Sequence, residues 1–257
     1  MNLALSARYL ARQWMRGQHL QDLPAGSAPA TRAEGYAVQR GWSALIGQVA
    51  GWKIAATSVA GQQHIGVSGP LAGPVFASRL RRGDARISLS GNRMRVAECE
   101  VVFIFGQDVH PRVKPWALGE VASLIAAISP GIEVPDSRFM RFEEAGEAQL
   151  IADGACCRDM VLGVPIKPDA LLPSLAGLRV RAQLSDGRAL EGLGSAVLGD
   201  PLEALRWFVT EMSETGQRIE AGQFVTTGAC VKPIPVQPGQ TVNADFGELG
   251  RMRVRFV

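Results

Sequence analysis

The sequence predicts an α+β fold in which helices come first and a rolled or barrel-like β-sheet follows. Apolar residues recur at helical spacing in the first 46 residues, whereas short strands separated by glycine and proline fill the last third of the chain. Helices and strands do not alternate in the regular order of a parallel βαβ sheet. With 257 residues, 47% of them apolar, the chain is long enough to bury a substantial core.

Two helices are expected near the N-terminus, over residues 3–21 and 30–46. Leucine, tyrosine and tryptophan recur there at helical spacing, and a stretch with Pro, Gly and Ser separates the two segments. No apolar run in this region is long enough for a signal peptide or a membrane span. We therefore expect a protein that does not enter the membrane.

The middle of the chain is expected to mix short strands, a loop and one helix. A strand is expected over residues 51–58. Residues 59–76 are so rich in glycine and proline that we expect an irregular loop that lines a site. The other elements expected here are a helix over residues 116–128 and strands over residues 85–90, 94–105, 131–139 and 159–163.

The last third of the chain is expected to be mostly β-structure. Residues 178–199 read as a hairpin with a turn at Asp186 and Gly187. A helix over residues 201–214 interrupts the strands, with Asp200 as its N-cap and Pro201 in its first turn. From residue 223 to the end, several strands follow one another between Gly and Pro residues.

Charge and cysteine content exclude several classes of protein. The 27 basic and 24 acidic residues are interspersed and give a net charge of +3, and the only dense basic cluster is RLRR at residues 79–82. We therefore expect no nucleic-acid partner. The cysteines form no CxxC pair and no zinc spacing, which is typical of free thiols in a reducing cytoplasm; they are Cys99, Cys156, Cys157 and Cys230.

Two glutamates precede a strongly apolar segment in the stretch RVAECEVVFIF. On an extended strand Glu98 and Glu100 point to the same face, and both faces continue with apolar residues, so we expect an internal strand. Two carboxylates in a dry interior repel each other and need a compensating cation. Mg²⁺ and Mn²⁺ prefer carboxylate oxygens. The alternative is a pair at the solvated end of the strand, bridged to Arg93 or Arg95.

A third acid and one lysine lie in similar apolar surroundings. Glu133 is flanked by Ile132 and Val134 in a second expected strand. Three glutamates from two interior strands would form an open metal site with positions left for water or a chelating substrate. Lys53 lies within GWKIA, where it can serve either as a counter-ion for one of these acids or as a catalytic group.

Several segments along the chain form a recognisable series. They are GWKIAATS, QQHIGV, AECEVVFIFGQDV, PGIEVPDSR, IADGACCRDMVLG, GSAVLGDPLEALRWF and GQFVTTGACVKPIPVQPGQTVNADFGELG. In order and spacing, over nearly the whole chain, this series resembles the branch of the fumarylacetoacetate hydrolase superfamily that is typified by 2-keto-4-pentenoate hydratase and 4-oxalocrotonate decarboxylase.

The resemblance implies a fold and an assembly. It implies a mixed β-roll with N-terminal and peripheral helices, usually assembled as a homo-oligomer. Residues 1–50 would form a helical segment packed on a fumarylacetoacetate hydrolase-like catalytic domain of residues 51–257.

The resemblance also implies a site for a small 2-oxo acid substrate. Lys53 would act beside the substrate as a catalytic residue. The segment TGA would help to hold the carboxylate end of the substrate. The implied ligands of Mg²⁺ or Mn²⁺ are Glu98, Glu100 and Glu133, and the TGA residues are Thr227, Gly228 and Ala229.

The sequence departs from the family pattern at positions near this site. Leu71 stands where family hydratases carry an aspartate, and Gly154, Ala155 and Cys156 stand where they carry Asn-Ala-Ser. Cys156 is expected to line the substrate site as a buried small residue, not as a nucleophile. His64, where the family often has glutamine, is a candidate acid or base; its alternative is a structural histidine on a loop.

The function we expect is hydration of a 2-hydroxydienoate by a metal-dependent lyase of the 2-keto-4-pentenoate hydratase type. The same ligands would also serve a 4-oxalocrotonate-type decarboxylase, so they do not choose between the two reactions. A C–C hydrolase of acylpyruvates would need a base such as His19, for which the sequence offers no convincing context. A relative that only binds ligands is the remaining alternative, and retention of Lys53 and all three glutamates speaks against it.

Overall fold

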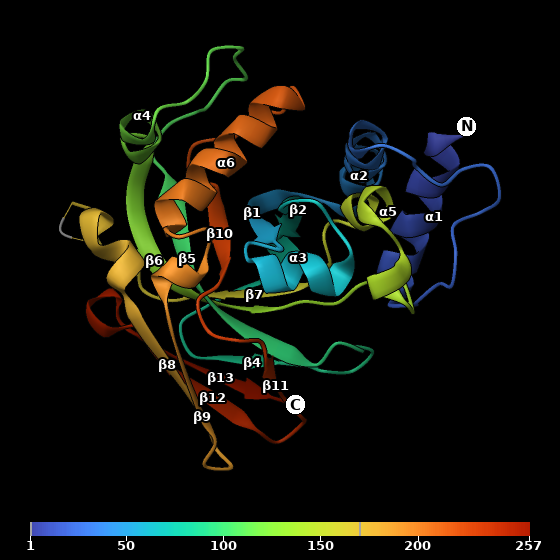
Figure 1. The fold of residues 1–257 in the computed structure, drawn as a ribbon. Helices are drawn as coiled ribbons and strands as arrows, with labels where there is room; N and C mark the ends of the chain where they lie inside the picture. The colour runs from blue at the N-terminus through green and yellow to red at the C-terminus, as the bar shows by residue number, and fades with distance from the viewer. Residues whose placement is uncertain (1, 170) are drawn as a thin grey trace.

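The computed structural model describes residues 2–169 and 171–257 and has an α+β fold built on two sheets (Figure 1). The larger sheet has the strand order β2-β1-β10-β5-β6-β7-β3, with β11 paired to β5, and the smaller has the order β4-β13-β12-β8-β9. The larger sheet mixes parallel and antiparallel pairs. The predicted fold class, a curled mixed sheet with peripheral helices, is confirmed.

The helices and strands have the following bounds. The α-helices are α1 (Leu3–Arg16), α2 (Arg32–Ile46), α3 (Val59–Ile65), α4 (Leu118–Ala122), α5 (Glu147–Ala152) and α6 (Pro201–Glu214). The strands of the larger sheet are β1 (Val49–Ala55), β2 (Leu71–Phe76), β3 (Leu80–Arg82), β5 (Val96–Phe105), β6 (Ile125–Val134), β7 (Asp159–Leu162), β10 (Phe224–Ala229) and β11 (Ile234–Pro235). The smaller sheet contains β4 (Ala85–Ile87), β8 (Arg179–Leu184), β9 (Ala189–Leu193), β12 (Thr241–Asp245) and β13 (Arg251–Phe256).

The two N-terminal helices pack against each other, and α2 also packs on α5 and on β2 at one end of the larger sheet (Figure 1). Trp14 of α1, Trp42 of α2 and Phe76 of β2 form an aromatic cluster with ring centroids 5.3 to 5.6 Å apart. α1 ends at Arg16 instead of residue 21, because Gly17 takes a left-handed backbone with φ of 60° that ends the helix. The division of the chain into segments 1–50 and 51–257 stays a prediction.

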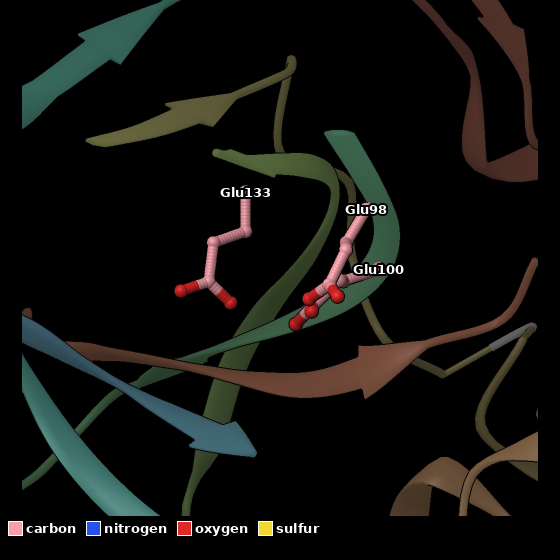
Figure 2. Close-up of side chains that lie close together, drawn as sticks. All are labelled: Glu98, Glu100 and Glu133. Carbon is pink, nitrogen blue, oxygen red and sulfur yellow. The ribbon is translucent and has the colours of Figure 1, made fainter. Parts of the chain in front are cut away.

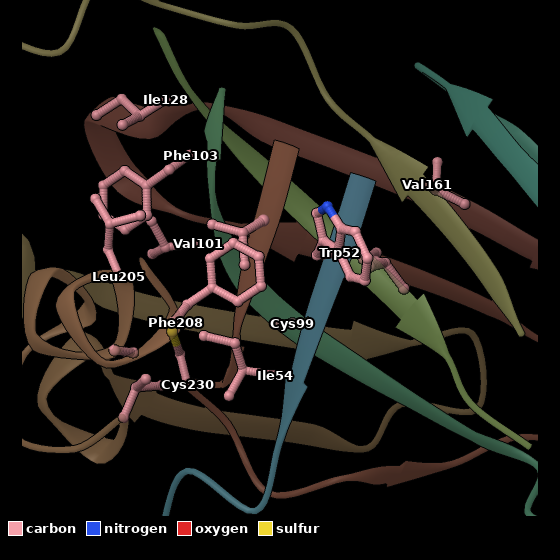
Figure 3. Packing of buried hydrophobic residues seen from close by; sticks show 14 of the residues in the cluster. Trp52, Ile54, Cys99, Val101, Phe103, Ile128, Val161, Leu205, Phe208 and Cys230 are labelled. Carbon is pink, nitrogen blue, oxygen red and sulfur yellow. The ribbon is translucent and has the colours of Figure 1, made fainter. Parts of the chain in front are cut away.

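The central strand of the larger sheet is β5, which lies between β10 and β6. On its apolar face, Phe105 packs against Phe208 of α6 with ring centroids 6.3 Å apart. Phe208 in turn packs against Trp52 of β1, with ring centroids 6.1 Å apart (Figure 3). Because Phe105 and Phe208 are buried against each other, α6 covers the apolar face of β5. The glutamates occupy the opposite face. The sequence-based expectation of an internal strand is therefore confirmed.

Two predicted elements differ from the structure. Residues 59–76 are not an irregular loop: they form α3, whose N-terminus is capped by the Ser58 side chain, and the fully buried strand β2. The predicted helix over residues 116–128 is only one short turn of helix, α4, because residues from Ile125 onward pair with β5 as the strand β6. In β2 and in β6, pairing within the sheet overrides the local sequence pattern.

The predicted strands over residues 51–58 and 131–139 end early, at Ala55 and Val134, whereas the predicted hairpin and the helix over residues 201–214 are present as expected. The hairpin of β8 and β9 turns at Gly187, whose φ is 92°, and α6 begins at Pro201 with the Asp200 side chain accepting a hydrogen bond of 2.8 Å from Leu202 N. All four cysteines are free and buried. Within residues 2–169 and 171–257, none of the helices combines the length and the apolar character that a membrane span needs.

Candidate metal centre

Three glutamate side chains converge between the paired strands β5 and β6. Glu98 and Glu133 are direct cross-strand partners, and Glu100 lies two residues further along β5 on the same face. One carboxylate oxygen from each residue lies within 4.8 Å of those of the other two (Figure 2). Like charges directly opposite each other destabilise a sheet. The antiparallel register therefore concentrates negative charge at one point of the sheet.

The cluster is buried, and several of its oxygens accept no hydrogen bond. Glu100 is 0% exposed and Glu133 is 2% exposed, whereas Glu98 keeps partial contact with solvent. Among the described residues, Glu100 Oε1 and both carboxylate oxygens of Glu133 accept no hydrogen bond. Burial raises the pKa of all three carboxyls; that of Glu100 rises to about 7, with the nearby charge of Glu98 as a further cause. These oxygens are available to coordinate a metal ion.

Lys53 brings one positive charge to the cluster from β1. Its Nζ lies 3.3 Å from Glu133 Oε1 and donates a hydrogen bond of 2.9 Å to the carbonyl of Ala155. Burial alone would lower the pKa of Lys53, but the carboxylates of Glu133 and Glu98 outweigh it and raise the pKa. Three carboxylates and one ammonium leave a formal charge of −2. A hard divalent cation would neutralise that charge, so the residues present fit Mg²⁺ or Mn²⁺.

The alternative of a solvated pair bridged to arginine is not supported. Arg95 Nε donates to the carbonyl of Asn92, and in the described part of the chain no ion pair joins Glu98 or Glu100 to Arg93 or Arg95. The glutamates are therefore placed for a shared cation, not for surface ion pairs.

The TGA segment at the end of β10 lies against the cluster. The backbone N–H of Gly228 donates a hydrogen bond of 2.9 Å to Glu100 Oε2. Gly228 has a left-handed φ of 99°, and a Cβ there would lie 1.9 Å from Oγ1 of Thr57, so only glycine fits. Ala229 is the register partner of Glu100. This segment therefore orients one carboxylate oxygen of Glu100 and leaves the other free.

The two threonines of this segment differ in their surroundings. The hydroxyl of Thr227 donates a hydrogen bond of 3.0 Å to the carbonyl of Val101, within the sheet. Thr226, which pairs with both Lys53 and Val102, lies on the face of the glutamates. In the described part of the chain its buried Oγ1 has no hydrogen-bond partner. The sequence analysis did not single out Thr226. Strand alternation placed Val102 on the glutamate face, but only the register of β10 with β5 shows that Thr226 lies beside Val102.

Cys156 lies in a backbone turn next to Lys53. It is buried, and burial strongly raises the pKa of its thiol. A thiol held in the neutral form is a poor nucleophile, in agreement with the expectation that Cys156 is a buried small residue and not a nucleophile. The neighbouring carbonyl of Ala155, which contacts Lys53, is a backbone group that no sequence motif could have indicated.

The remaining candidates are not joined to the cluster by any hydrogen bond or ion pair within the described residues. His64 is exposed in the last turn of α3, and its ring lies edge-on to Phe142 with centroids 6.1 Å apart. Leu71 is fully buried in the apolar core. His19 Nε2 lies 3.1 Å from Asp136 Oδ2. The roles of His64, Thr227, Gly228, Ala229 and Cys156 toward a substrate stay predictions.

Comparison with known proteins identifies the class of this chain. The model of the fumarylacetoacetate (FAA) hydrolase C-terminal family matches residues 66–257. The chain therefore belongs to the fumarylacetoacetate hydrolase family, and the resemblance seen in the sequence is confirmed.

Curated relatives include hydratases and a decarboxylase. The 2-keto-4-pentenoate hydratase of Paraburkholderia xenovorans (strain LB400) is 32% identical over 212 residues, which cover 81% of this chain and 76% of the relative. The 4-oxalocrotonate decarboxylase of a Pseudomonas species is 28% identical over 203 residues, which cover 79% and 76% of the two chains. Both activities considered from the sequence thus occur among the relatives.

Solved structures share the fold. A 4-oxalocrotonate decarboxylase from Pseudomonas putida G7, complexed with magnesium and adipate, has a TM-score of 0.86 at 23% identity and covers 100% of this chain and 97% of that chain. A fumarylpyruvate hydrolase from Pseudomonas aeruginosa, in complex with Mn²⁺ and pyruvate, has a TM-score of 0.61 at 15% identity and covers 80% and 88% of the two chains. At these identities the likeness shows the fold alone.

Proposed function

We propose that this protein is a divalent-metal-dependent hydratase of the lyase class, which adds water to a 2-hydroxydienoate as 2-keto-4-pentenoate hydratases do. The observation that carries the proposal is the buried cluster of three carboxylates, with orphaned oxygens and one ammonium beside it. The hydratase relatives at about 30% identity support the same reaction class.

Glu98, Glu100 and Glu133 would hold Mg²⁺ or Mn²⁺. When bound, the ion supplies positive charge that stabilises the enolate form of a 2-oxo acid. The protein holds the ligands ready in advance: the β5–β6 register brings Glu98 and Glu133 together, and Gly228 N–H orients Glu100. The coordinating atoms therefore need little rearrangement.

Lys53 would act on the substrate directly. Its Nζ carries three N–H donors, one of which is taken by the carbonyl of Ala155 while Glu133 lies beside it. A remaining N–H would neutralise charge on the substrate or deliver a proton to it. Because Lys53 lies on a buried β-strand, this donor is held in one place relative to the carboxylates.

A second candidate function is decarboxylation of a 4-oxalocrotonate-type 2-oxo acid. It is favoured by the fully buried leucine at position 71, where the resembling hydratases carry an aspartate. Loss of CO₂ needs a group that accepts the electron pair and a proton donor, but no base that activates water. Lys53 alone could supply the proton.

Hydrolysis of an acylpyruvate is less well supported. It needs a general base for water, and within the described residues the candidate His19 makes no hydrogen bond or ion pair with the carboxylate cluster; its ring nitrogen lies beside Asp136 instead. We further propose that the protein works in the cytoplasm as a homo-oligomer. The four free, buried cysteines support the reducing compartment, and light scattering of the purified protein tests the assembly.

One experiment separates these reactions. Purified protein with Mg²⁺ or Mn²⁺ is incubated with 2-hydroxypentadienoate, with 4-oxalocrotonate and with an acylpyruvate, and the products are identified by NMR. A 4-hydroxy-2-oxo acid from the first substrate is the expected result. Release of CO₂ from the second substrate alone would favour the decarboxylase, and the absence of turnover with every substrate would contradict both proposals.

The metal ligands are tested by Glu98→Gln, with Glu144→Gln as the control because Glu144 is 66% exposed and paired only to Arg141. Glu98→Gln removes one negative ligand, so we expect the affinity for Mn²⁺ in isothermal titration calorimetry to fall at least about tenfold. The control should bind as the wild type does. Equal affinity in all three proteins would contradict the assignment.

A further inference from the structure

A backbone turn beside Lys53 takes an unusual conformation. Gly154, Ala155 and Cys156 have φ values of 78°, 52° and 60°, so three consecutive residues are left-handed and two of them are not glycine. Side chains disfavour this conformation, and such a run persists only where the surroundings hold it in place. Residues 154–156 must therefore be held by contacts with neighbouring elements.

The turn is pressed against β2 at a single glycine. A Cβ on Gly73 would lie 1.9 Å from the carbonyl oxygen of Gly154, so the two backbones meet where no side chain intervenes. Gly73 is the cross-strand partner of Lys53 in β1. This close approach brings the carbonyl of Ala155 to 2.9 Å from Lys53 Nζ.

Helix α2 holds the turn from its other side. The side-chain amide of Gln39 donates to two carbonyls, that of Ala72 in β2 at 2.9 Å and that of Ile151 in α5 at 2.8 Å. Trp42 Nε1 donates to the carbonyl of Ala152 at 2.7 Å. Since α5 runs directly into the turn, Gln39 ties the start of the turn to the strand against which the turn packs.

We propose that Gln39 and Gly73 are positioning residues for the reaction proposed above. They hold residues 154–156 against β2, so that the carbonyl of Ala155 fixes the ammonium of Lys53 beside Glu133. Only the predicted fall in kcat rests on the proposed function; the geometry of Lys53 does not. Gln39 and Lys53 both precede residue 66, where the family match begins, so the N-terminal part of the chain completes the site.

The geometry is tested without any turnover by NMR of the lysine ammonium groups. The chain has four lysines, and Lys114, Lys167 and Lys232 are exposed, so Lys53 alone should give an ammonium signal protected from exchange with water. Gly73→Ala should abolish this protection, because its Cβ pushes the turn away. Gly69→Ala is the matched control, since a Cβ there meets nothing within 4 Å.

Gln39→Met is the second variant, in case Gly73→Ala does not fold. It keeps the length of the side chain but removes both hydrogen bonds, and it should also expose the Lys53 ammonium to exchange. With substrate, kcat should fall about 10- to 100-fold while Mn²⁺ affinity stays unchanged. A purely structural role would instead lower Mn²⁺ affinity and kcat together.

Two results would overturn the inference. One is an unprotected Lys53 ammonium in the wild type; the other is full protection in both Gly73→Ala and Gln39→Met. If the wild type shows protection that the variants lose, but turns over no substrate, the proposed function is contradicted while the positioning of Lys53 by Gln39 and Gly73 is supported.

Discussion

At the scale of single residues, the candidate site depends on carboxylates that the fold keeps in an unfavourable environment. Glu100 and Glu133 are buried, and Glu133 lies directly across from Glu98 in the sheet. Their pKa values are raised because burial penalises the charged form. The side chains that form the site therefore reduce the stability of the metal-free protein near neutral pH.

This arrangement predicts the pH dependence of the metal-free protein. The pKa of Glu100 is about 7 in the folded protein against an ordinary value of 4.5, so the folded state binds more protons than the unfolded state between these values. The stability of the metal-free protein should fall as pH rises from about 4.5 to 7. Urea unfolding across this range in EDTA checks it. Glu100→Gln should flatten the dependence, and an unchanged slope in this variant would contradict the assignment.

Gly228 gives a second prediction at this scale. Gly228→Ala forces a side chain into a left-handed backbone and onto Thr57, so it should destabilise the protein by about 1–3 kcal/mol and weaken Mn²⁺ binding through Glu100. Gly222→Ala is the control, because Gly222 also has a positive φ but open space around it. Thermal unfolding and calorimetry measure both effects. Equal losses in the two variants would mean that the contact with Thr57 and Glu100 is unimportant.

At the scale of elements, α6 supports the sheet that carries the site. Phe208 is fully buried and contacts both Trp52 of β1 and Phe105 of β5, the strands that carry Lys53 and two of the glutamates. The helix therefore fixes the apolar face of the same strands whose polar face forms the cluster. Mutations in its core-facing side should change both stability and the geometry of the site.

Phe208→Ala should lower the free energy of unfolding by about 3–5 kcal/mol, the usual cost of removing a buried phenylalanine. Leu118→Ala, at a helical position that is 37% exposed, serves as the control and should cost far less. Urea unfolding in the presence of Mg²⁺ measures both. Similar losses in the two variants would show that α6 contributes little to the packing of the sheet.

At the scale of the whole molecule, metal binding should be linked to folding. The proposed ligands come from β5 and β6, and Lys53 of β1 offsets only one of their three negative charges. A bound divalent cation would balance the other two. An ion that binds the folded chain alone stabilises it, by about 2.7 kcal/mol at a concentration 100 times its dissociation constant.

Addition of Mg²⁺ or Mn²⁺ should therefore raise the melting temperature, and EDTA should reverse the rise. Differential scanning calorimetry measures the melting temperature with each ion added in turn, and Ca²⁺ is included as a further divalent ion. Glu133→Gln should abolish most of the rise. A rise of the same size in this variant would place the metal elsewhere on the protein.

The sequence by itself determined the elements whose signals are local. The hairpin turn at Asp186 and Gly187, the start of α6 at Asp200 and the apolar strand β5 are all specified by neighbouring residues. Strand alternation also placed Glu98 and Glu100 on one face. Their apolar surroundings also singled out Glu133 and Lys53, and the family resemblance then implied that both residues act together with this pair.

Only the tertiary structure decided how distant segments meet. The register of β5 and β6 sets Glu98 against Glu133, and it also turns the expected helix after residue 124 into a strand. The hydrogen bond from the Lys53 ammonium to the backbone carbonyl of Ala155 joins two residues that are 102 positions apart in the chain. Such contacts arise from packing and sheet pairing, whose energies depend on partners far away in sequence, so no local pattern contains them.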